Sequence, residues 1–364
     1  MKVAIIHYWL INQRGGEKVL ESLCEIFPNA DIFTHVYDES KFYDSIISRH
    51  NVYTSFINKL PFSKKFYQYY LPLMPYALEN LDLDEYDLII SSESGPAKGV
   101  ITNPHAIHIC YCHSPMRYAW DMHSMYSQGF GLLKKILFSF FIHHIRRWDQ
   151  LNSTQVDYFV ANSKFIASRI KKFYSRDCEI INPPVDISKF NISYLDDGYY
   201  LFVGQLVKYK NVELLINTFN INKKNLIIVG DGEEFKNLKK LIKSNNIKMT
   251  GKQDFYSLRD YFSRCKCLIY PGIEDFGITA VEAMACGKPV IGYGKGGILD
   301  TVIDGVTGKL FYEKTPDSLN NCINEFEQHF SLDPLIIRKH AEKFSKNSFK
   351  QKIKNLLLSL DIKN

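Results

Sequence analysis

The chain has 364 residues, of which 46% are hydrophobic and 23% are charged. These proportions exclude general disorder, and the length allows two or three domains. The formal charge of +6, from 45 basic and 39 acidic residues, is too mild for a protein built to bind nucleic acid. Eight cysteines are too sparse for a disulfide scaffold in a chain of this length. We therefore expect a reduced, cytoplasmic globular protein.

Two hydrophobic stretches could be mistaken for membrane-directed segments. The N-terminal stretch has a single lysine, a short apolar run and no small-residue cleavage site, so it does not resemble a signal peptide. Residues 130–148 are apolar, but paired lysines and paired histidines interrupt them. We do not expect this segment to cross a membrane.

Short apolar runs alternate with amphipathic segments along the chain. Their continuous hydrophobicity is typical of parallel strands covered on both faces. The runs predicted as strands are 2–7, 88–91, 107–112, 158–161, 200–203, 226–229, 267–270 and 289–291. Helices are predicted over 16–27, 212–220, 233–244 and 349–360. This alternation predicts α/β layers joined by right-handed crossovers.

The α/β pattern restarts after residues 181–198, where adjacent prolines and turn-forming residues predict an interdomain linker. We expect an N-terminal domain over 1–185 and a second domain over 186–345. A C-terminal helical segment over 346–364 follows and can pack back on the N-terminal domain.

A pair of carboxylates flanks a predicted helix start in the second domain. Glu274 lies in the loop after the strand at 267–270, and Glu282 lies inside the helix that follows. Free backbone amides at this helix start suit a phosphate. These amides belong to Phe276, Gly277, Ile278 and Thr279. The carboxylates are better suited to accept hydrogen bonds from sugar hydroxyls.

Other loops of the second domain follow predicted strands. Lys210 lies in the loop after the strand at 200–203, where an anion would be met in an α/β sheet, although a solvated loop lysine is an equal alternative. The Gly-Asp-Gly turn at 230–232 is structural. Glycines at 292, 294 and 297 fit the G-x-G-x-x-G dinucleotide fingerprint, but they fall too late in the domain for it.

The first domain offers an anion site and a histidine. Gly15 and Gly16 open a helix after the first strand, which exposes backbone amides to an anion. His113 ends the strand at 107–112, where a ligand-facing loop begins, although a structural histidine is the commoner outcome. The neighbouring histidines and cysteines at 105–113 do not have the spacing of a zinc site. The Asp-Leu-Asp motif at 82–84 precedes a strand, so an ordinary loop is favoured over a metal site.

Taken in order, these motifs resemble the retaining GT-B glycosyltransferases of family 4, the glycosyl transferases group 1. The carboxylate pair matches the E-x7-E signature of that family. The lysine loop, the Gly-Asp-Gly turn, the Gly-Gly loop and the linker segment at 182–186 match as well, so the resemblance spans nearly the whole chain. Residues 111–121 (YCHSPMRYAWD) further resemble the bacterial O-antigen mannosyltransferases of the WbaZ type. The resemblance implies two Rossmann-like α/β domains facing each other across a cleft.

The resemblance also implies a role for each matched residue. Glu282 would hydrogen-bond the ribose of a nucleotide donor, and Glu274 would hold hydroxyls of the transferred sugar. Lys210 and the amides of Gly15–Gly16 would neutralise the diphosphate leaving group. His113 would lie near the reacting centre of the sugar. Because lysine and helix-terminal amides stabilise the developing charge, such enzymes need no metal ion or other cofactor.

The same resemblance favours GDP-mannose as the donor, with other GDP- or UDP-hexoses left open. The family's base-contacting loop corresponds to 251–253 and includes Lys252. The acceptor would be a growing glycan on a polyprenyl diphosphate. We therefore expect a cytoplasmic enzyme attached to the inner face of a bacterial plasma membrane, in O-antigen or other surface polysaccharide synthesis.

One position departs from the family pattern. Gln205 stands where the family usually has arginine after the glycine of the lysine loop, and glutamine carries no charge. Either Lys208 substitutes for it, or diphosphate binding is weaker, or the donor binds differently. A catalytically inactive sugar-nucleotide-binding module is therefore an alternative. A phosphorylase or synthase of the same fold and a NAD-dependent oxidoreductase explain fewer of the motifs.

Positive charge in the first 185 residues gathers in three segments, 56–76, 130–148 and 163–176. Together they carry 12 basic residues and no acidic residue. Lysines and arginines among aromatic rings are what an interfacial segment needs on an anionic membrane. The alternative is a helix pair that covers the core and exposes a solvated basic face.

Overall fold

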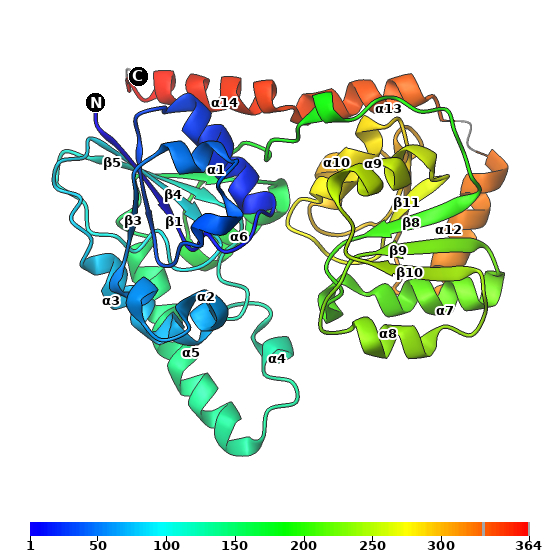
Figure 1. The fold of residues 1–364 in the computed structure, drawn as a ribbon, viewed down its shortest axis with the longest axis horizontal. Coiled ribbons are helices and arrows are strands. Elements are labelled where there is room, and N and C mark those ends of the chain that lie inside the picture. Colours follow the sequence, from blue (N-terminus) through cyan, green and yellow to red (C-terminus); the bar gives the residue numbers. More distant parts are fainter. Residues whose placement is uncertain (330–331, 363–364) are drawn as a thin grey trace. The chain divides into compact units, whose positions relative to one another are not determined.

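The computed structural model describes residues 1–329 and 332–362, and it divides into two compact units (Figure 1). Unit 1 comprises Met1–Pro184 and Phe349–Asn364, and unit 2 comprises Val185–Ser348. Residues 363–364 of the expected C-terminal segment lie outside the described part of the chain. The change of unit after Pro184 falls inside the segment that the sequence suggested as a linker. Ile187 and Phe190 of that segment are nevertheless buried in the core of unit 2.

Unit 1 is built on a seven-stranded parallel sheet with the order β3-β2-β1-β4-β5-β6-β7. The strands are β1 Val3–His7, β2 Asp31–Thr34, β3 Val52–Thr54, β4 Leu88–Glu93, β5 Ile107–Cys112, β6 Tyr158–Ala161 and β7 Cys178–Ile180. β1 pairs with β2 on one side and β4 on the other, so the strand order reverses beside β1. Such a reversal is where open α/β sheets place their ligands.

Helices cover both faces of this sheet. Val3 and Ile5 of β1 belong to one core cluster, while Ala4 and Ile6 belong to another on the opposite face. This two-sided burial explains the continuous apolar runs of the sequence. The α-helices are α1 Gly15–Ile26, α2 Ser63–Phe66, α3 Met74–Glu79, α4 His123–Tyr126, α5 Leu132–Asn152 and α6 Lys164–Tyr174. The short 3-10 turns are η1 Glu39–Lys41, η2 Ile46–Arg49, η3 Phe56–Lys59 and η4 Tyr67–Leu73.

The C-terminal helix α14, Lys346–Ser359, begins at the end of unit 2 and continues into unit 1. Phe349, Ile353 and Leu356 on one side of it are buried in the same core cluster as β1 and α1. Lys350 adds an ion pair with Glu25 of α1. The last helix therefore completes the core of unit 1.

Unit 2 is built on a six-stranded parallel sheet with the order β10-β9-β8-β11-β12-β13. Its strands are β8 Tyr199–Val203, β9 Asn225–Val229, β10 Ile247–Gly251, β11 Cys267–Tyr270, β12 Val290–Tyr293 and β13 Gly308–Phe311. Its α-helices are α7 Val212–Asn222, α8 Phe235–Leu241, α9 Phe255–Arg264, α10 Ile278–Ala285, α11 Ile298–Thr301, α12 Pro316–His329 and α13 Pro334–Ala341. Its 3-10 turns are η5 Ile187–Lys189, η6 Lys208–Lys210 and η7 Glu342–Phe344. The strand order reverses beside β8, as it does beside β1 in unit 1.

All eight predicted strands are present in the structure, with both ends within two residues of the predicted ones. The strands β2, β3, β7, β10 and β13 were not predicted. They are only three to five residues long, and several contain charged or polar residues that hide the apolar pattern. Among the described residues, no helix is both long and apolar enough to cross a membrane.

A buried ionic network ties α5 and α6 to the end of β4. The ammonium of Lys98 forms ion pairs with Glu93 and Asp149, and all three side chains are fully buried. Asp149 also accepts hydrogen bonds from the indole of Trp120 at 2.7 Å and the hydroxyl of Tyr174 at 2.8 Å. Burial opposes the charge of Lys98, but the two carboxylates outweigh it and raise the pKa of the ammonium above its ordinary value.

Replacing Lys98 should therefore destabilise unit 1 strongly. Lys98→Met leaves two buried carboxylates without their cation, which we expect to lower the free energy of unfolding by about 3–5 kcal/mol. Lys171→Met is the matched control, because Lys171 pairs with Asp177 at the exposed surface and should cost less than about 1 kcal/mol. Urea unfolding followed by circular dichroism measures both, and equal losses would contradict the assignment.

Candidate active site

In unit 2, two of the predicted site residues meet where the strand order reverses. β8 pairs with β9 on one side and β11 on the other, so the loops after β8 and β11 leave adjacent strand ends. Lys210 follows β8 and Glu274 follows β11. Their side chains form an ion pair and are largely buried, at 14% and 12% exposure. The structure thus brings these two predicted residues together.

Close backbone approach holds the two loops in place. A Cβ on Gly272 would lie 2.9 Å from the Cα of Lys210, so only glycine fits between these loops. A Cβ on Gly296 would lie 2.7 Å from the carbonyl oxygen of Glu274, and the N–H of Gly297 donates to that same oxygen at 2.8 Å. Of the three glycines that resembled a dinucleotide fingerprint, Gly297 therefore packs against the Glu274 loop, whereas a Cβ on Gly292 would meet Ile298 and one on Gly294 would meet Tyr312.

The predicted phosphate-binding amides lie at the start of α10. Gly277 is the N-cap and has a φ of +98°, a conformation that glycine adopts without strain. Phe276 is buried, and its ring lies 5.4 Å from that of Phe344. Ile278 and Thr279 are the first two residues of the helix. The carboxylate of Glu282 is in the second turn and is also buried.

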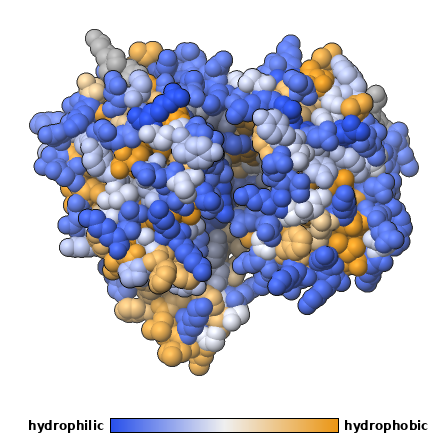
Figure 2. Space-filling view, viewed as in Figure 1, coloured by the Kyte–Doolittle hydropathy of each residue, from blue (hydrophilic) through white to orange (hydrophobic). Residues whose placement is uncertain are grey.

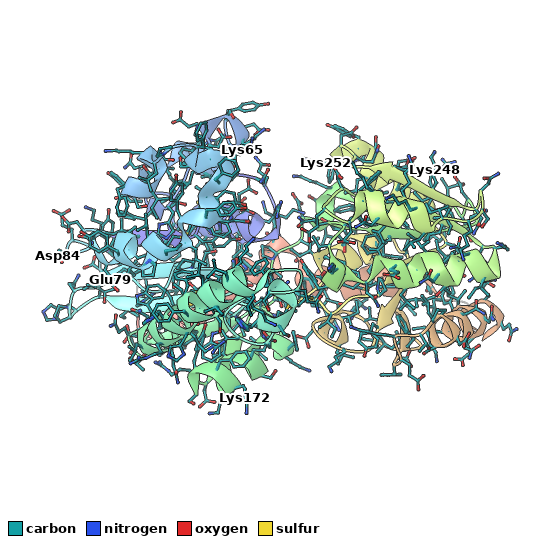
Figure 3. The ribbon with its side chains drawn as sticks, turned by 90° about the horizontal axis from the view of Figure 1, so that it is seen from below. Lys65, Glu79, Asp84, Lys172, Lys248 and Lys252 are labelled. Atoms are coloured by element: carbon teal, nitrogen blue, oxygen red, sulfur yellow. The ribbon has the colours of Figure 1, made fainter. Side chains whose placement is uncertain are left out.

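Three predicted residues lie apart from the Lys210–Glu274 pair. Gln205 and Lys208 belong to the same loop as Lys210 but are exposed. Lys208 lines a cavity of about 240 Å³ together with Glu213 of α7 and Glu234. Lys252 follows β10, which is separated from β8 by β9, and lies at the surface (Figure 3).

In unit 1 a chain of hydrogen bonds begins at His113. Its Nε2 lies 2.9 Å from the hydroxyl of Ser92, which in turn lies 3.0 Å from Nδ1 of His7. His7 and Ser92 are register partners on β1 and β4, at the point where the strand order reverses. Nε2 of His7 lies 3.7 Å from the carboxylate of Glu17. Because the Ser92 hydroxyl has one proton, it donates to one ring and accepts from the other.

His113 is a neutral imidazole at neutral pH. Burial, assisted by His7, lowers its pKa from 6.5 to about 3. Its backbone N–H donates to the carbonyl oxygen of Glu93 at 2.8 Å, which anchors the start of the loop after β5. The side chain can therefore donate or accept a hydrogen bond but does not add positive charge to the site.

Gly15 and Gly16 begin α1, close to His7. A Cβ on Gly16 would clash with the hydroxyl of Tyr8 and lie 3.6 Å from Cε1 of His7. The N-terminal amides of α1, a helix of 12 residues, are thus held beside the end of β1. Gly15, Gly16 and His113 belong to unit 1, and the other predicted site residues belong to unit 2.

His7 and Ser92 were not predicted from the sequence. Both lie at the carboxyl ends of their strands, and that position is the signal that could have identified them. Within the described residues, no group of three or more His, Cys, Asp or Glu side chains is placed to hold a metal ion. Asp84 of the Asp-Leu-Asp motif lies in an exposed loop (Figure 3).

Comparison with known families accounts for both units. The model of Glyco_transf_4, Glycosyltransferase Family 4, matches residues 13–189. The model of Glycos_transf_1, Glycosyl transferases group 1, matches residues 186–351. The chain belongs to the group 1, family 4 glycosyltransferases.

Curated relatives match over part of their length. The uncharacterised glycosyltransferase MJ1178 of Methanocaldococcus jannaschii is 30% identical over 198 residues, which are 53% of this chain and 56% of that protein. The alpha-1,3/1,6-mannosyltransferase ALG2 of Saccharomyces cerevisiae is 27% identical over 254 residues, covering 55% and 48%. The chain thus spans about half the length of these relatives.

Solved structures establish the fold. Alr3699/HepE of Anabaena, solved in complex with UDP, has a TM-score of 0.71 at 18% identity, over 99% of this chain and 100% of that one. Sucrose-phosphate synthase of Thermosynechococcus elongatus has a TM-score of 0.70 at 16% identity, over 99% of each chain. The two parallel α/β sheets therefore form a GT-B fold, as the sequence predicted.

Removing the hydroxyl between the two histidines tests the hydrogen-bonded chain in unit 1. Ser92→Ala deletes both contacts, so we expect a loss of about 1–3 kcal/mol in unfolding free energy. It should also change the ¹⁵N imidazole shifts of His113 and His7. Ser91→Ala is the matched control, because the neighbouring Ser91 hydroxyl contacts His108 instead, at 2.9 Å. Unchanged His113 shifts in Ser92→Ala would contradict the chain.

Proposed function

We propose that this protein is a retaining glycosyltransferase that moves a hexose from a nucleotide sugar to a glycan carried on a polyprenyl diphosphate. The observation that carries the proposal is the Lys210–Glu274 ion pair where the strand order reverses, with Glu282 on the adjoining helix. One cation for a diphosphate and two carboxylates for hydroxyl groups are what a sugar nucleotide requires. Membership of the glycosyltransferase family supports the reaction class.

In this proposal each residue has a separate part. Lys210 releases Glu274 and binds the diphosphate, and the carboxylate then accepts hydrogen bonds from hydroxyls of the transferred sugar. Glu282 accepts hydrogen bonds from the ribose. Amides at the starts of α1 and α10 add further donors to the phosphates. Gln205 and Lys208, in the loop after β8, also contact the donor, and so does Lys252 in the loop after β10.

The chemical step needs charge stabilisation more than an enzymic nucleophile. The acceptor hydroxyl oxygen bonds to the anomeric carbon while the bond from that carbon to the phosphate oxygen breaks. The leaving diphosphate takes up the hydroxyl proton, so the transfer is balanced and occurs on one face with retention. Lys210 and the helix-terminal amides stabilise the charge that develops on the diphosphate, and the step needs no metal ion.

The neutral imidazole of His113 suits a place beside the reacting sugar. A hydrogen-bonding group without charge can hold a sugar hydroxyl and does not compete with Lys210 for the diphosphate. Ser92 and His7 would act as positioning residues, because their contacts orient the ring of His113.

For the donor we propose GDP-mannose, and for the pathway a surface polysaccharide such as O-antigen. The similarity of residues 111–121 to the WbaZ-type enzymes and the mannosyltransferase name of ALG2 support mannose. The alternatives are another GDP-hexose or a UDP-hexose, and HepE has been solved with UDP-glucose. A lipid-linked acceptor would place the protein at the cytoplasmic face of a bacterial plasma membrane.

A second candidate function follows from Gln205. Its exposed amide stands where the family usually supplies a guanidinium, so the diphosphate receives one charge fewer. A sugar-nucleotide-binding module with little turnover would keep the ligand contacts of unit 2. Incubation with radiolabelled sugar nucleotides separates the two, since slow donor hydrolysis is expected only of the active transferase.

The donor base can be identified by nucleotide binding. We expect GDP to raise the unfolding temperature more than UDP or ADP does, because binding to the folded state alone stabilises it. Thermal-shift measurements with the three diphosphates provide the comparison. Stabilisation by UDP alone would overturn GDP-mannose as the donor.

Removing the cation at 210 should weaken nucleotide binding without unfolding unit 2. Lys210→Met loses a charge-assisted contact worth about 2 kcal/mol, so we expect the Kd of the preferred nucleoside diphosphate to rise about 30-fold. Lys239→Met, on the exposed face of α8, is the matched control and should leave the Kd unchanged. Isothermal titration calorimetry measures both, and an unaltered Kd in Lys210→Met would contradict the assignment.

The role of His113 predicts separate effects on binding and transfer. His113→Asn should leave the nucleotide Kd within about twofold and lower the transfer rate about 100-fold, the size expected for a lost contact to the reacting centre. The lowered pKa means that His113 is charged only below about pH 3. Its ionisation should thus leave no inflection in the rate between pH 5 and 9. A rate step near pH 6.5 that disappears in His113→Asn would contradict this.

A further inference from the structure

Helix α5 carries two apolar stripes on opposite sides. One contains Phe138, Phe141, Ile142 and Ile145 and packs in a core cluster of unit 1. The other contains Leu133, Ile136, Leu137 and Phe140, which follow the i, i+3, i+4, i+7 spacing of one helix face. A helix that covers a domain normally has polar residues on this second side. The second stripe takes no part in this core cluster.

The second stripe is open to solvent. Leu133 is 71% exposed, Ile136 56%, Leu137 61% and Phe140 67%, and the adjacent Leu132 is 78% exposed. Figure 2 shows apolar surface gathered at the lower end of unit 1, where Figure 1 places the N-terminal end of α5. Several large apolar side chains exposed next to one another are typical of an interaction surface.

The topology places this surface beyond the edge of the sheet that carries His113. The chain leaves β5 at Cys112, returns through α5 and enters β6, so the N-terminal end of α5 lies toward the carboxyl ends of the strands. α5 has 21 residues and rises about 31 Å. β5 has 6 residues and spans about 20 Å. The helix is therefore longer than the strand by its first two to three turns. Within α5, only residues from Ile142 onward are buried.

Charge identifies what fits this surface. Lys134 and Lys135 lie in the first turns of α5 and are exposed, and the ammonium of Lys134 is 4.1 Å from the ring centre of Phe130. No acidic residue occurs in the helix before Asp149, which is buried. Exposed leucines and a phenylalanine between lysines match an anionic lipid surface: the apolar groups enter the acyl boundary and the lysines meet the headgroups.

We propose that the N-terminal half of α5, Leu132–Phe140, is the element that docks this protein on an anionic membrane. The proposal deepens the proposed function, because a docking surface at the His113 edge would bring a lipid-linked acceptor to that edge. The basic segment 163–176 has its rings at least partly covered, with Phe173 stacked on Trp120 at 4.8 Å between ring centres. That segment exposes lysines such as Lys172 (Figure 3) and fits the alternative of a solvated basic face.

Sedimentation with vesicles tests the charge of this surface. The full chain should bind vesicles that contain phosphatidylglycerol and be released by high salt, while phosphatidylcholine vesicles bind it weakly. Lys134→Gln/Lys135→Gln should lower the partition constant about 30-fold, from two lysines near the surface. Lys239→Gln/Lys240→Gln, an adjacent exposed pair on α8, is the matched control and should change it less than about twofold.

The apolar stripe is tested in the same assay. Leu137→Ser/Phe140→Ser should lower the partition constant at least about 10-fold. Leu335→Ser/Ile336→Ser removes two exposed apolar residues of α13 in unit 2 and should have no effect. Equal effects of the two double variants, or indifference of the wild type to lipid charge, would overturn the proposal. So would a dimer in solution that Leu137→Ser/Phe140→Ser dissociates, because the stripe would then bind a second copy.

Donor hydrolysis and nucleotide binding separate this proposal from the proposed function. Both should be unchanged in the α5 variants, whose circular dichroism and unfolding should match the wild type. Vesicle binding through α5 without turnover of any donor would leave the docking surface in place and overturn the transferase. Turnover of a donor without lipid binding would support the transferase and overturn the docking surface.

Discussion

The structure depends on the parallel arrangement of every strand in both sheets. Parallel strands bring all their carboxyl ends to one edge, and connecting loops diverge only where the strand order reverses. This reversal occurs beside β1 in unit 1 and beside β8 in unit 2. His7 and Ser92 meet at the first reversal, and Lys210 and Glu274 meet at the second. The candidate chemistry of the chain is thus a consequence of strand order.

The buried charges of the two units serve different ends. Lys98 lies between two carboxylates without solvent access, so its ammonium is part of the architecture and holds α5 against β4. The Lys210–Glu274 pair keeps some exposure, and each partner can exchange the other for a ligand group: a phosphate for the lysine and a hydroxyl for the carboxylate. Such an ion pair neutralises the two charges when no donor is bound. In the proposed reaction the same two side chains bind the phosphate and the sugar hydroxyl of the donor.

Helix α5 links the interior of unit 1 to its surface. Asp149, near the C-terminal end of the helix, is held in the network of Lys98, which also contains the Glu93 side chain. The carbonyl oxygen of Glu93 accepts a hydrogen bond from the backbone N–H of His113. About 26 Å of helix separates Asp149 from Leu132 at the exposed end. A helix fixed at one end in the core is a rigid arm, so the proposed membrane contact and the His113 edge would keep a constant spacing.

The sequence alone determined eight of the strands, because a strand covered on both faces is largely apolar, and it determined the GT-B fold through the order of its motifs. It also identified Lys210, Glu274 and His113 as residues that follow strands. Tertiary structure decided which of them meet. The Ser92 hydroxyl between two histidines, the pairing of Lys98 with Asp149 and the glycine contacts that brace Glu274 join residues far apart in the chain, and no local pattern encodes them. The open stripe of α5 was likewise settled only by packing, since an apolar face in a sequence does not reveal whether another element covers it.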